Sequence, residues 1–201
     1  MNNNGFNYID LELLSGTLWA TCNVGAKNSE EAGLYFQWGD TRGYTIEQIR
    51  KNKQCSFTNY KCGSNENSSS FSKYKKKGAK LELADDAANI YMGGDWHMPT
   101  SEQIQELIDN TTREFEIFNN GISYMTFTSK NDITKSIIIS TAGCALDDSV
   151  DYSGNYGYIW SSMLNTSFVA YGQYLYFDLG GAKLYSSGIR WYGMQVRGVI
   201  G

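Results

Sequence analysis

The last 45 residues of the chain (157–201) contain four short runs: Gly157-Tyr158-Ile159-Trp160-Ser161-Ser162, Tyr174-Leu175-Tyr176-Phe177-Asp178, Ile189-Arg190-Trp191-Tyr192-Gly193 and Gln195-Val196-Arg197-Gly198-Val199. Turns rich in Gly and Ser separate these runs, which predicts a meander of short antiparallel strands. The segment shows no nucleophile with a neighbouring base and no set of metal ligands. It is typical of a scaffold that displays side chains, and it therefore favours binding over catalysis.

The second run predicts a strand with two different faces. A period of two puts Leu175, Phe177 and Leu179 on one face. We expect this apolar face to lie in the core. The opposite face is free to point outward and carries aromatic and polar side chains: Tyr174, Tyr176 and Asp178.

The remainder of the chain adds further strands and one long polar segment. Residues 8–11, 17–21 and 34–38 form short strand-like runs. Residues 122–128 alternate between apolar and polar, and 136–140 form a continuous apolar run of the buried type. The polar stretch of about 41–80 predicts a loop-rich insertion on the surface.

Two main helices are expected. The first spans 84–91 and ends at Gly93. The second follows Pro99, where Thr100 and Gln103 have the spacing of a capping box. Its apolar side chains share one face at helical spacing: Ile104, Leu107 and Ile108. Early helices followed by a twisted, mostly antiparallel sheet predict an α+β fold, and a length of 201 residues predicts a single domain over 1–201.

Composition and charge favour neither nucleic acid nor a membrane as a partner. The net charge of -4 gives no reason to expect binding to nucleic acid. No apolar run approaches the roughly 20 residues that span a bilayer, so we expect no membrane insertion.

The start, Met1-Asn2-Asn3-Asn4, lacks the features of a signal peptide. Either a leader has been removed, or the protein is delivered by another route, for example on a virus particle.

Six blocks of sequence occur in an order that is typical of one family: Leu18-Trp19-Ala20-Thr21-Cys22-Asn23-Val24-Gly25-Ala26, Tyr35-Phe36-Gln37-Trp38-Gly39, Asp85-Asp86-Ala87-Ala88, Gly93-Gly94-Asp95-Trp96-His97-Met98-Pro99-Thr100, Gly157-Tyr158-Ile159-Trp160-Ser161-Ser162 and Gly193-Met194-Gln195-Val196-Arg197. With these blocks nearly the whole chain resembles the Fibrobacter succinogenes major paralogous domain, which is common in proteins of Bacteroidetes. That domain is similar to the C-type lectin-like fold of formylglycine-generating enzymes and of the variable proteins of diversity-generating retroelements. In those variable proteins, C-terminal strands and loops present a diversified ligand-binding surface. The resemblance therefore implies this fold and, for the function, ligand binding.

The resemblance also singles out a set of site residues. Relatives usually have a stretch rich in Asn and Ser where this chain has aromatic and small residues. A retroelement that randomises adenines turns Asn codons of the AAC type into any codon ending in C, and such codons encode neither Trp, Met, Lys nor Gln. Framework residues fall in that unreachable group: Trp160, Trp191, Met194 and Gln195. Residues whose codons can arise in this way occupy the rest of the stretch. Our hypothesis is that they were diversified and form a ligand-binding face together with Trp191: Phe168, Tyr171, Tyr174, Tyr176, Asp178, Tyr185, Ser186, Ser187, Gly188 and Ile189.

The composition of this set supports the hypothesis and leaves one alternative. Tyr with Ser and Gly is the composition of antibody loops, because tyrosine supplies a large contact area and loses little side-chain entropy. The alternative is that a tyrosine-rich strand is simply good β-sheet material.

Other chemistries have less support. His97 is the only histidine, which excludes a zinc site with several histidines and favours a structural contact with a carboxylate or a backbone carbonyl. Asp147, Asp148 and Asp151 could supply oxygen ligands to calcium, but a solvated acidic turn is favoured. Formylglycine-generating enzymes use a late pair of cysteines, and this chain has only Cys144 there. We therefore expect no catalytic residue, no metal site and no cofactor.

Cysteines and buried charges leave further alternatives open. Cys55 and Cys62 either close a small loop as a disulfide or remain buried thiols. Asp85 or Asp86, besides serving the N-terminus of the first helix, could pair with an arginine of the C-terminal segment. We expect buried thiols at Cys22 and Cys144. The arginine that pairs with Asp85 or Asp86 would be Arg190 or Arg197. Core positions are expected for four tryptophans: Trp19, Trp38, Trp96 and Trp160.

These observations predict a non-enzymatic adhesin or receptor-binding protein that is secreted, on a cell surface or exposed on a virion. Its expected partner is a protein or glycan on a host or neighbouring cell. Replacing Tyr174 and Tyr176 by Ala is expected to abolish binding with little change in melting temperature. The alternatives are a non-diversified structural or fimbrial surface domain and, least favoured, an enzyme of the formylglycine-generating kind.

Overall fold

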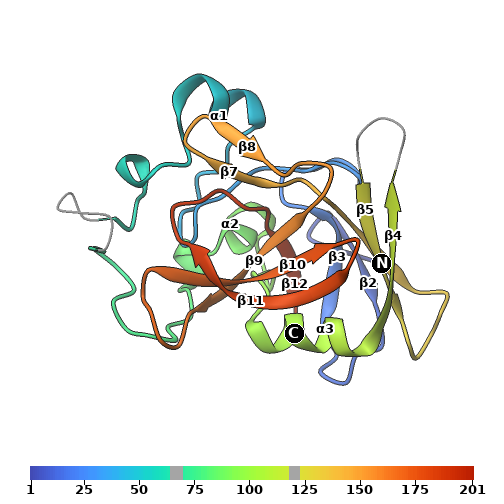
Figure 1. Ribbon diagram of the computed structural model, residues 1–201. Coiled ribbons are helices and arrows are strands. Elements are labelled where there is room, and N and C mark those ends of the chain that lie inside the picture. The colour runs from blue at the N-terminus through green and yellow to red at the C-terminus, as the bar shows by residue number, and fades with distance from the viewer. Residues whose placement is uncertain (64–69, 118–122) are drawn as a thin grey trace.

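The structure of the protein is a computed structural model that describes residues 1–63, 70–117 and 123–201 (Figure 1). It is an α+β fold with antiparallel sheets, as predicted. Its described helices are α1 (Ile46–Asn52), α2 (Ala87–Met92) and α3 (Ser101–Asn110). The last two agree with the expected pair. The short helix α1 was not expected, so the prediction of two main helices is wrong by one.

The first sheet joins the two ends of the described chain. Its strand order is β1-β2-β3-β12, and the strands are β1 (Asn2–Asn3), β2 (Phe6–Asp10), β3 (Leu18–Asn23) and β12 (Arg197–Ile200). Val199 lies opposite Trp19 in the β3–β12 pair. Strands from the first and last residues therefore stabilise each other, although almost the whole chain separates them.

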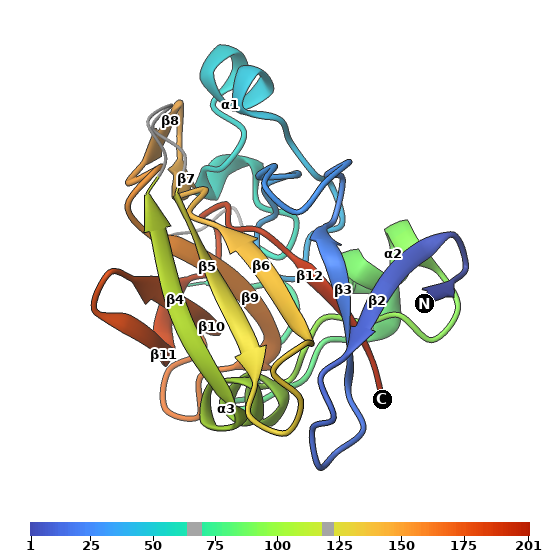
Figure 2. The ribbon, with the colours of Figure 1, turned by 90° about the vertical axis from the view of Figure 1, so that its right-hand side faces the viewer.

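Two further sheets surround α3. One has the order β4-β5-β6, formed by β4 (Thr111–Ile117), β5 (Ser123–Ser129) and β6 (Ser136–Ser140), and the other has the order β11-β10-β9, formed by β9 (Gly157–Leu164), β10 (Tyr171–Asp178) and β11 (Gly181–Ile189). Figure 2 shows β4, β5 and β6 in front of β9, with α3 below them. A two-stranded ribbon of β7 (Cys144–Leu146) and β8 (Ser149–Asp151) lies near α1 in Figure 1.

Helix α3 forms where its sequence predicts it. The Thr100 hydroxyl accepts a hydrogen bond from the backbone N–H of Gln103, and the Gln103 side chain accepts one from the backbone N–H of Thr100, which completes the capping box. Its apolar face is buried, as expected: Ile104, Leu107 and Ile108. The same device starts α1, where Thr45 and Gln48 form a second capping box.

The sheet of β9, β10 and β11 has a core cluster on each face. Leu175 and Phe177 face α3 and the β4–β6 sheet, and both are fully buried in a cluster that includes Phe127. On the opposite face, Trp160 and Tyr174 belong to a second cluster. That cluster also holds Phe36, Trp38, Met194 and Val196. This double coverage decides which side chains of the sheet can meet a ligand.

Three expectations about strands and insertion need correction. Residues 34–38 form isolated bridges at Tyr35 and Phe36 instead of a strand, because Tyr35 pairs with Tyr44 whereas Phe36 pairs with Met194, in a different part of the chain. Leu179 is 74% exposed, because β10 ends at Asp178 and the turn releases Leu179 from the core face. The insertion of about 41–80 contains α1 and a 3₁₀ turn at Phe57–Asn59, and part of it lies outside the described residues.

Candidate ligand-binding face

Tyrosines from three strands meet on one face of the β9–β11 sheet. Tyr174 lies opposite Trp160 on β9 and Tyr185 on β11. Tyr176 lies opposite Tyr158 on β9 and Lys183 on β11. Since directly opposite residues point to the same face, the strand register alone brings these side chains together.

The rings pack into a continuous cluster. The centroid of the Tyr176 ring lies 5.3 Å from that of Tyr185, 5.6 Å from that of Tyr158 and 5.8 Å from that of Tyr156. These separations are typical of interacting aromatic pairs. We call the described tyrosines of this assembly the tyrosine cluster: Tyr152, Tyr156, Tyr158, Tyr174, Tyr176 and Tyr185.

Exposure divides the eleven predicted site residues into three groups. Four are exposed: Phe168, Tyr185, Ser186 and Ser187. Five are half-buried: Tyr171, Tyr176, Asp178, Ile189 and Trp191. Two are buried: Tyr174 and Gly188. Nine of the eleven can therefore be reached by a ligand at least in part.

The expectation that Tyr174 points outward is wrong. Its side chain lies on the predicted face, but the segments around Trp38 and Met194 cover that end of the face. The Tyr174 ring packs edge-on against Trp160 with centroids 6.0 Å apart. Burial raises the pKa of Tyr174, and a hydrogen bond with Ser187 offsets this only in part.

Gly188 is a packing position within the predicted face. A Cβ atom at Gly188 would lie 2.5 Å from Cζ3 of Trp160 and 2.9 Å from Cδ1 of Tyr174. Its partner across the β10–β11 pair is Gly172, where a Cβ atom would lie 2.8 Å from Cδ1 of Trp38. The two glycines let β10 and β11 lie close to Trp38 and Trp160. A side chain at Gly188 would therefore displace Trp160 or the strand itself.

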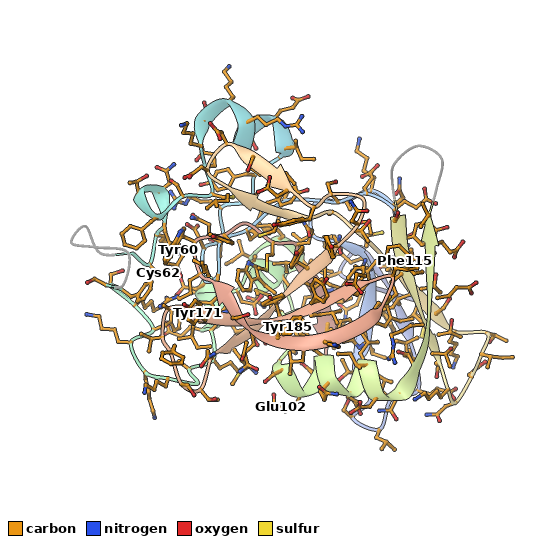
Figure 3. All side chains as sticks on the ribbon, in the orientation of Figure 1. Tyr60, Cys62, Glu102, Phe115, Tyr171 and Tyr185 are labelled. Atoms are coloured by element: carbon orange, nitrogen blue, oxygen red, sulfur yellow. The ribbon has the colours of Figure 1, made fainter. Side chains whose placement is uncertain are left out.

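The predicted residues occupy two regions along β10 and β11. Phe168 and Tyr171 stand at one end, with ring centroids 6.2 Å apart. Tyr176 and Asp178 stand at the other end, where the Tyr176 hydroxyl donates a hydrogen bond of 2.6 Å to Oδ2 of Asp178. Figure 3 shows Tyr171 on the side of the molecule where Tyr60 and Cys62 lie, away from Phe115. Tyr185 lies between the two ends.

The first region is continuous with the insertion. Trp191 packs edge-on against Phe57, with centroids 5.2 Å apart. Val169 and Ala170 pack against a small core of the insertion formed by Tyr60, Cys62 and Phe71. The insertion is therefore part of the scaffold that supports Phe168 and Tyr171.

Arg190 holds the insertion against this region. It is fully buried, and its guanidinium donates hydrogen bonds to the Tyr60 hydroxyl at 2.9 Å and to the carbonyl oxygens of Lys73 at 3.1 Å and Val169 at 3.2 Å. The guanidinium carbon lies 4.2 Å from the ring centroid of Phe71. One side chain thus bonds three separate segments, and cation–π contacts compensate in part for its burial.

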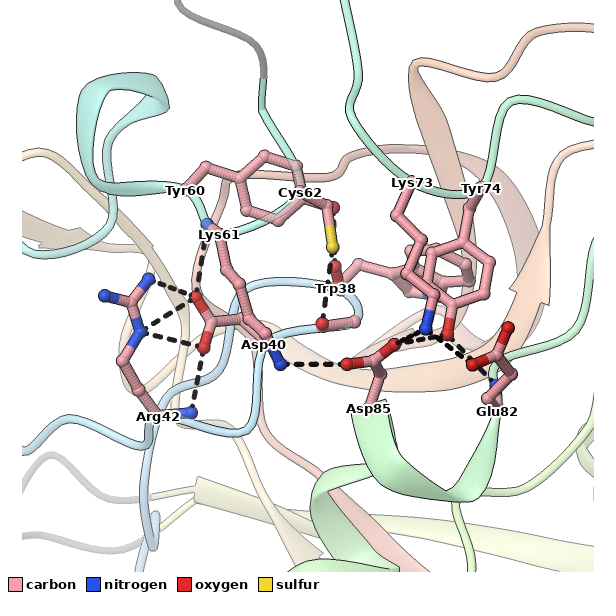
Figure 4. Close-up of polar contacts among 11 residues, drawn as sticks. Trp38, Asp40, Arg42, Tyr60, Lys61, Cys62, Lys73, Tyr74, Glu82 and Asp85 are labelled. Carbon is pink, nitrogen blue, oxygen red and sulfur yellow. Dashed lines mark hydrogen bonds and ion pairs between the residues drawn. The ribbon is translucent and has the colours of Figure 1, made fainter.

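The expected ion pair between Asp85 or Asp86 and an arginine is wrong. The Asp85 carboxylate accepts hydrogen bonds from Nζ of Lys61 at 2.8 Å, from Nζ of Lys73 at 2.5 Å and from the Tyr74 hydroxyl at 2.6 Å (Figure 4). Burial opposes ionisation of Asp85, but these hydrogen bonds outweigh it and lower its pKa to about 2. The lysines lie within the insertion, so Asp85 is its second anchor.

Asp86 and Arg197, the other charged residues considered for this ion pair, have structural partners. Asp86 caps α2 by accepting a hydrogen bond from Asn89 N, as expected of a helix start, and it also accepts one from Met98 N. Arg197 is fully buried and donates to Asn23 Oδ1 and to the carbonyl oxygens of Ala20 and Ile138. Burial lowers its pKa to about 10.

His97 is structural, as expected, because its ring nitrogens lie 2.9 Å from the Met98 carbonyl oxygen and 3.0 Å from that of Gly201. Asp148 forms an ion pair with Lys53 at 3.4 Å. Over residues 1–63, 70–117 and 123–201, no three His, Cys, Asp or Glu side chains gather as metal ligands.

Cysteines and tryptophans complete the comparison with the sequence. All four cysteines are free thiols, so Cys55 and Cys62 do not form a disulfide. Cys144 is buried, but Cys22 is only half-buried, which corrects the expectation for that residue. The four framework tryptophans are in the core, as predicted: Trp19, Trp38, Trp96 and Trp160.

Sequence reasoning missed part of the face. Tyr156 and Tyr158 contribute rings to the tyrosine cluster, but neither belongs to the set of site residues predicted from the sequence. The period-two spacing of Tyr156, Tyr158 and Trp160 is the signal that could have assigned them to one face. Lys183 could have been found in the same way, from its spacing to Tyr185.

The helices in the described part of the chain lack the length and apolarity needed to cross a membrane. Comparison of the chain with protein-family models, with curated proteins and with solved structures finds no match in any of the three.

Proposed function

We propose that the protein is a ligand-binding protein with a C-type lectin-like fold, related to the variable proteins of diversity-generating retroelements and without enzymatic activity. It binds a protein or glycan on a host or neighbouring cell through the face of β10, β11 and the adjoining turn. The observation that carries the proposal is the exposure of this face to solvent: four of its predicted residues are exposed, whereas Tyr174 and Gly188 are buried. The exposed ones are of the residue types expected of a diversified surface: Phe168, Tyr185, Ser186 and Ser187.

The physical chemistry of the face suits recognition. Tyr185 is 39% exposed, and its ring packs against those of Tyr174 and Tyr176 on the neighbouring strand. A supported ring has little conformational freedom left to lose on binding, so its contact area converts efficiently into affinity. Ser186 and Ser187 lie where the pairing of β10 and β11 shifts register, and there they add hydrogen-bonding groups to the edge strand.

The rigid scaffold is separate from the variable surface. Trp160, Met194 and Gln195 are buried next to the exposed part of the face. Arg190 and Asp85 anchor the flanking insertion through contacts that do not use the exposed residues. Exposed positions could therefore change identity without loss of the core, which is the property that a diversified binding protein requires.

Binding to cell surfaces tests the proposal. The fluorescently labelled protein is incubated with cells from the environment of the source organism, and bound fluorescence is measured by flow cytometry. We expect the double variant Tyr185→Ala, Phe168→Ala to lose binding. The matched control, Leu14→Ala with Ile133→Ala, removes apolar side chains that are 91% and 82% exposed elsewhere on the surface. If the control loses as much binding as the face variant, the face is misassigned.

A further inference from the structure

A cavity of about 410 Å³ opens beside the Asp178 end of the candidate face. Its walls come from the turn that precedes β9, from the turn after β10 and from the β4–β5 pair. Its lining includes Ser153, Asn155, Tyr156, Asp178, Gly180 and Phe115. The volume lies within the range of pockets that hold small molecules, roughly 300–1,000 Å³.

Asp178 provides a fixed acceptor in this cavity. Its Oδ1 accepts a hydrogen bond of 2.7 Å from the backbone N–H of Gly180, and its Oδ2 accepts the bond from the Tyr176 hydroxyl. A carboxylate has about four acceptor positions, so these two bonds hold its orientation and leave capacity for ligand hydroxyl groups. Among the described residues that line the cavity, Asp178 is the only charged one.

Tyr156 provides an aromatic wall. Its ring stacks on Tyr176 with an interplanar angle of 27°, and the Tyr152 ring packs edge-on against it at 5.4 Å. These contacts fix the plane of the ring. The backbone of the same turn is held by the hydrogen bonds from Gly154 N to Thr141 O, 2.7 Å, and from Asn155 N to Tyr152 O, 3.1 Å.

We propose that this cavity binds one neutral pyranose residue of a glycan, an inference that rests on the proposed ligand-binding function. A pyranose has an apolar face of C–H groups and a rim of hydroxyl groups. The ring of Tyr156 matches the apolar face. Asp178, Asn155 and Ser153 offer the acceptors and donors that the hydroxyl groups need. The carboxylate of Asp178 repels uronic and sialic acids, which selects neutral sugars.

The test is a titration of the isotope-labelled full chain with methyl glycosides, followed through backbone amide chemical shifts. The panel contains neutral hexosides, an N-acetylhexosaminide and a hexuronide at millimolar concentrations. We expect a neutral glycoside to shift the amides of Asn155 and Gly180 and the hexuronide to leave them unchanged. Tyr156→Ala should weaken binding roughly tenfold, whereas Tyr156→Phe should retain it.

A control variant and a cavity variant test the assignment. Ile133→Ala removes a side chain that is 82% exposed and lies outside both the cavity and the face, and it should leave glycoside binding unchanged. Asp178→Asn should weaken binding of the neutral glycoside and abolish the discrimination against the hexuronide. The amide spectrum of each variant shows whether it is folded.

The inference is overturned if no neutral glycoside shifts the Asn155 and Gly180 amides, or if Tyr156→Ala binds as well as the wild type. Its failure is distinguishable from failure of the proposed function. Cell binding that depends on Tyr185 and Phe168 in a protein that binds no glycoside would leave the proposed function standing and refute the pyranose site alone.

Discussion

Tyr174 lies directly opposite Tyr185 across the β10–β11 pair, with ring centroids 5.9 Å apart, yet 9% of Tyr174 is exposed against 39% of Tyr185. The two rings share one face of the sheet, but only Tyr174 lies beneath the segments around Trp38 and Met194. Neighbouring tyrosines therefore have different roles: Tyr174 belongs to the core, and Tyr185 is a surface residue.

This difference predicts unequal effects on stability. Tyr174→Ala leaves a cavity between Trp160 and Gly188, and we expect it to lower the free energy of unfolding by about 3 kcal/mol. Tyr185→Ala should lower it by less than about 1 kcal/mol, because an exposed ring loses few contacts. Urea unfolding followed by tryptophan fluorescence measures both values. Equal losses would show that the two rings are equally covered.

The burial of Tyr174 changes the effect that is expected of the double variant Tyr174→Ala, Tyr176→Ala. The double variant Tyr174→Ala, Tyr176→Ala was expected to keep its melting temperature, because both rings were assigned to an outward face. With Tyr174 buried, we expect this double variant to melt at a lower temperature. It is therefore unsuitable as a test of binding, and Tyr185 and Phe168 replace it.

Gly188 should tolerate no side chain. Because a Cβ atom would lie 2.5 Å from Trp160, we expect Gly188→Ala to cost roughly 1–3 kcal/mol of unfolding free energy through overpacking. Ser186→Ala, an exposed change in the same strand, is the matched control and should stay within roughly 0.5 kcal/mol of the wild type. Chemical denaturation compares the two. A neutral effect of Gly188→Ala would mean that Trp160 can shift.

Acid should weaken the anchor at Asp85. The pKa of this carboxyl is lowered to about 2, so it stabilises the folded protein above its ordinary pKa, near 4, and this stabilisation is lost as the pH falls from about 4 to 2. We expect the free energy of unfolding of the wild type to exceed that of Asp85→Asn by roughly 1–2 kcal/mol at pH 7, and we expect this difference to vanish near pH 2. Unfolding titrations across this pH range measure it. A difference that does not change with pH would contradict the assignment of the ion pairs.

Loss of Arg190 should release the insertion. Arg190→Met removes the hydrogen bonds to Tyr60, Lys73 and Val169, and Arg190→Lys cannot replace them because lysine lacks the planar fork. We expect faster amide hydrogen exchange in both variants at 57–63 and 70–74, with α3 still protected. Arg42→Met, at a side chain that is 52% exposed, is the control and should have a smaller effect. Unchanged exchange in the insertion would show that Asp85 alone holds it.

Local sequence signals predicted the elements well. The capping box at Thr100 and the apolar spacing of Ile104, Leu107 and Ile108 located α3, because both signals depend on neighbours within one or two turns. Alternation also assigned Leu175 and Phe177 to the core. Helix α1 was missed although Thr45 and Gln48 carry the same capping signal, because the polar composition around it suggested loops.

Contacts between distant segments were not predictable in the same way. Alternation separates the two faces of β10 but does not say that residues around Trp38 and Met194 cover part of the second face. Arg190 bonds Tyr60 and Lys73 of the insertion, which lie far from it in the chain, and Asp85 bonds Lys61 and Lys73 of the same insertion. Charge alone suggested that they pair with each other, whereas the fold gives each a different partner.

Sequencing of the coding region for residues 157–201 across a population of the source organism tests whether the face is diversified. We expect variation in codons ending in C at the exposed and half-buried positions, with Tyr174 and Gly188 nearly constant and Trp160, Trp191, Met194 and Gln195 fixed. The expected variable positions are Phe168, Tyr171, Tyr176, Asp178, Tyr185, Ser186, Ser187 and Ile189. An invariant region, or variation spread over random codon positions, would contradict a diversified binding face and favour a surface domain of fixed structure.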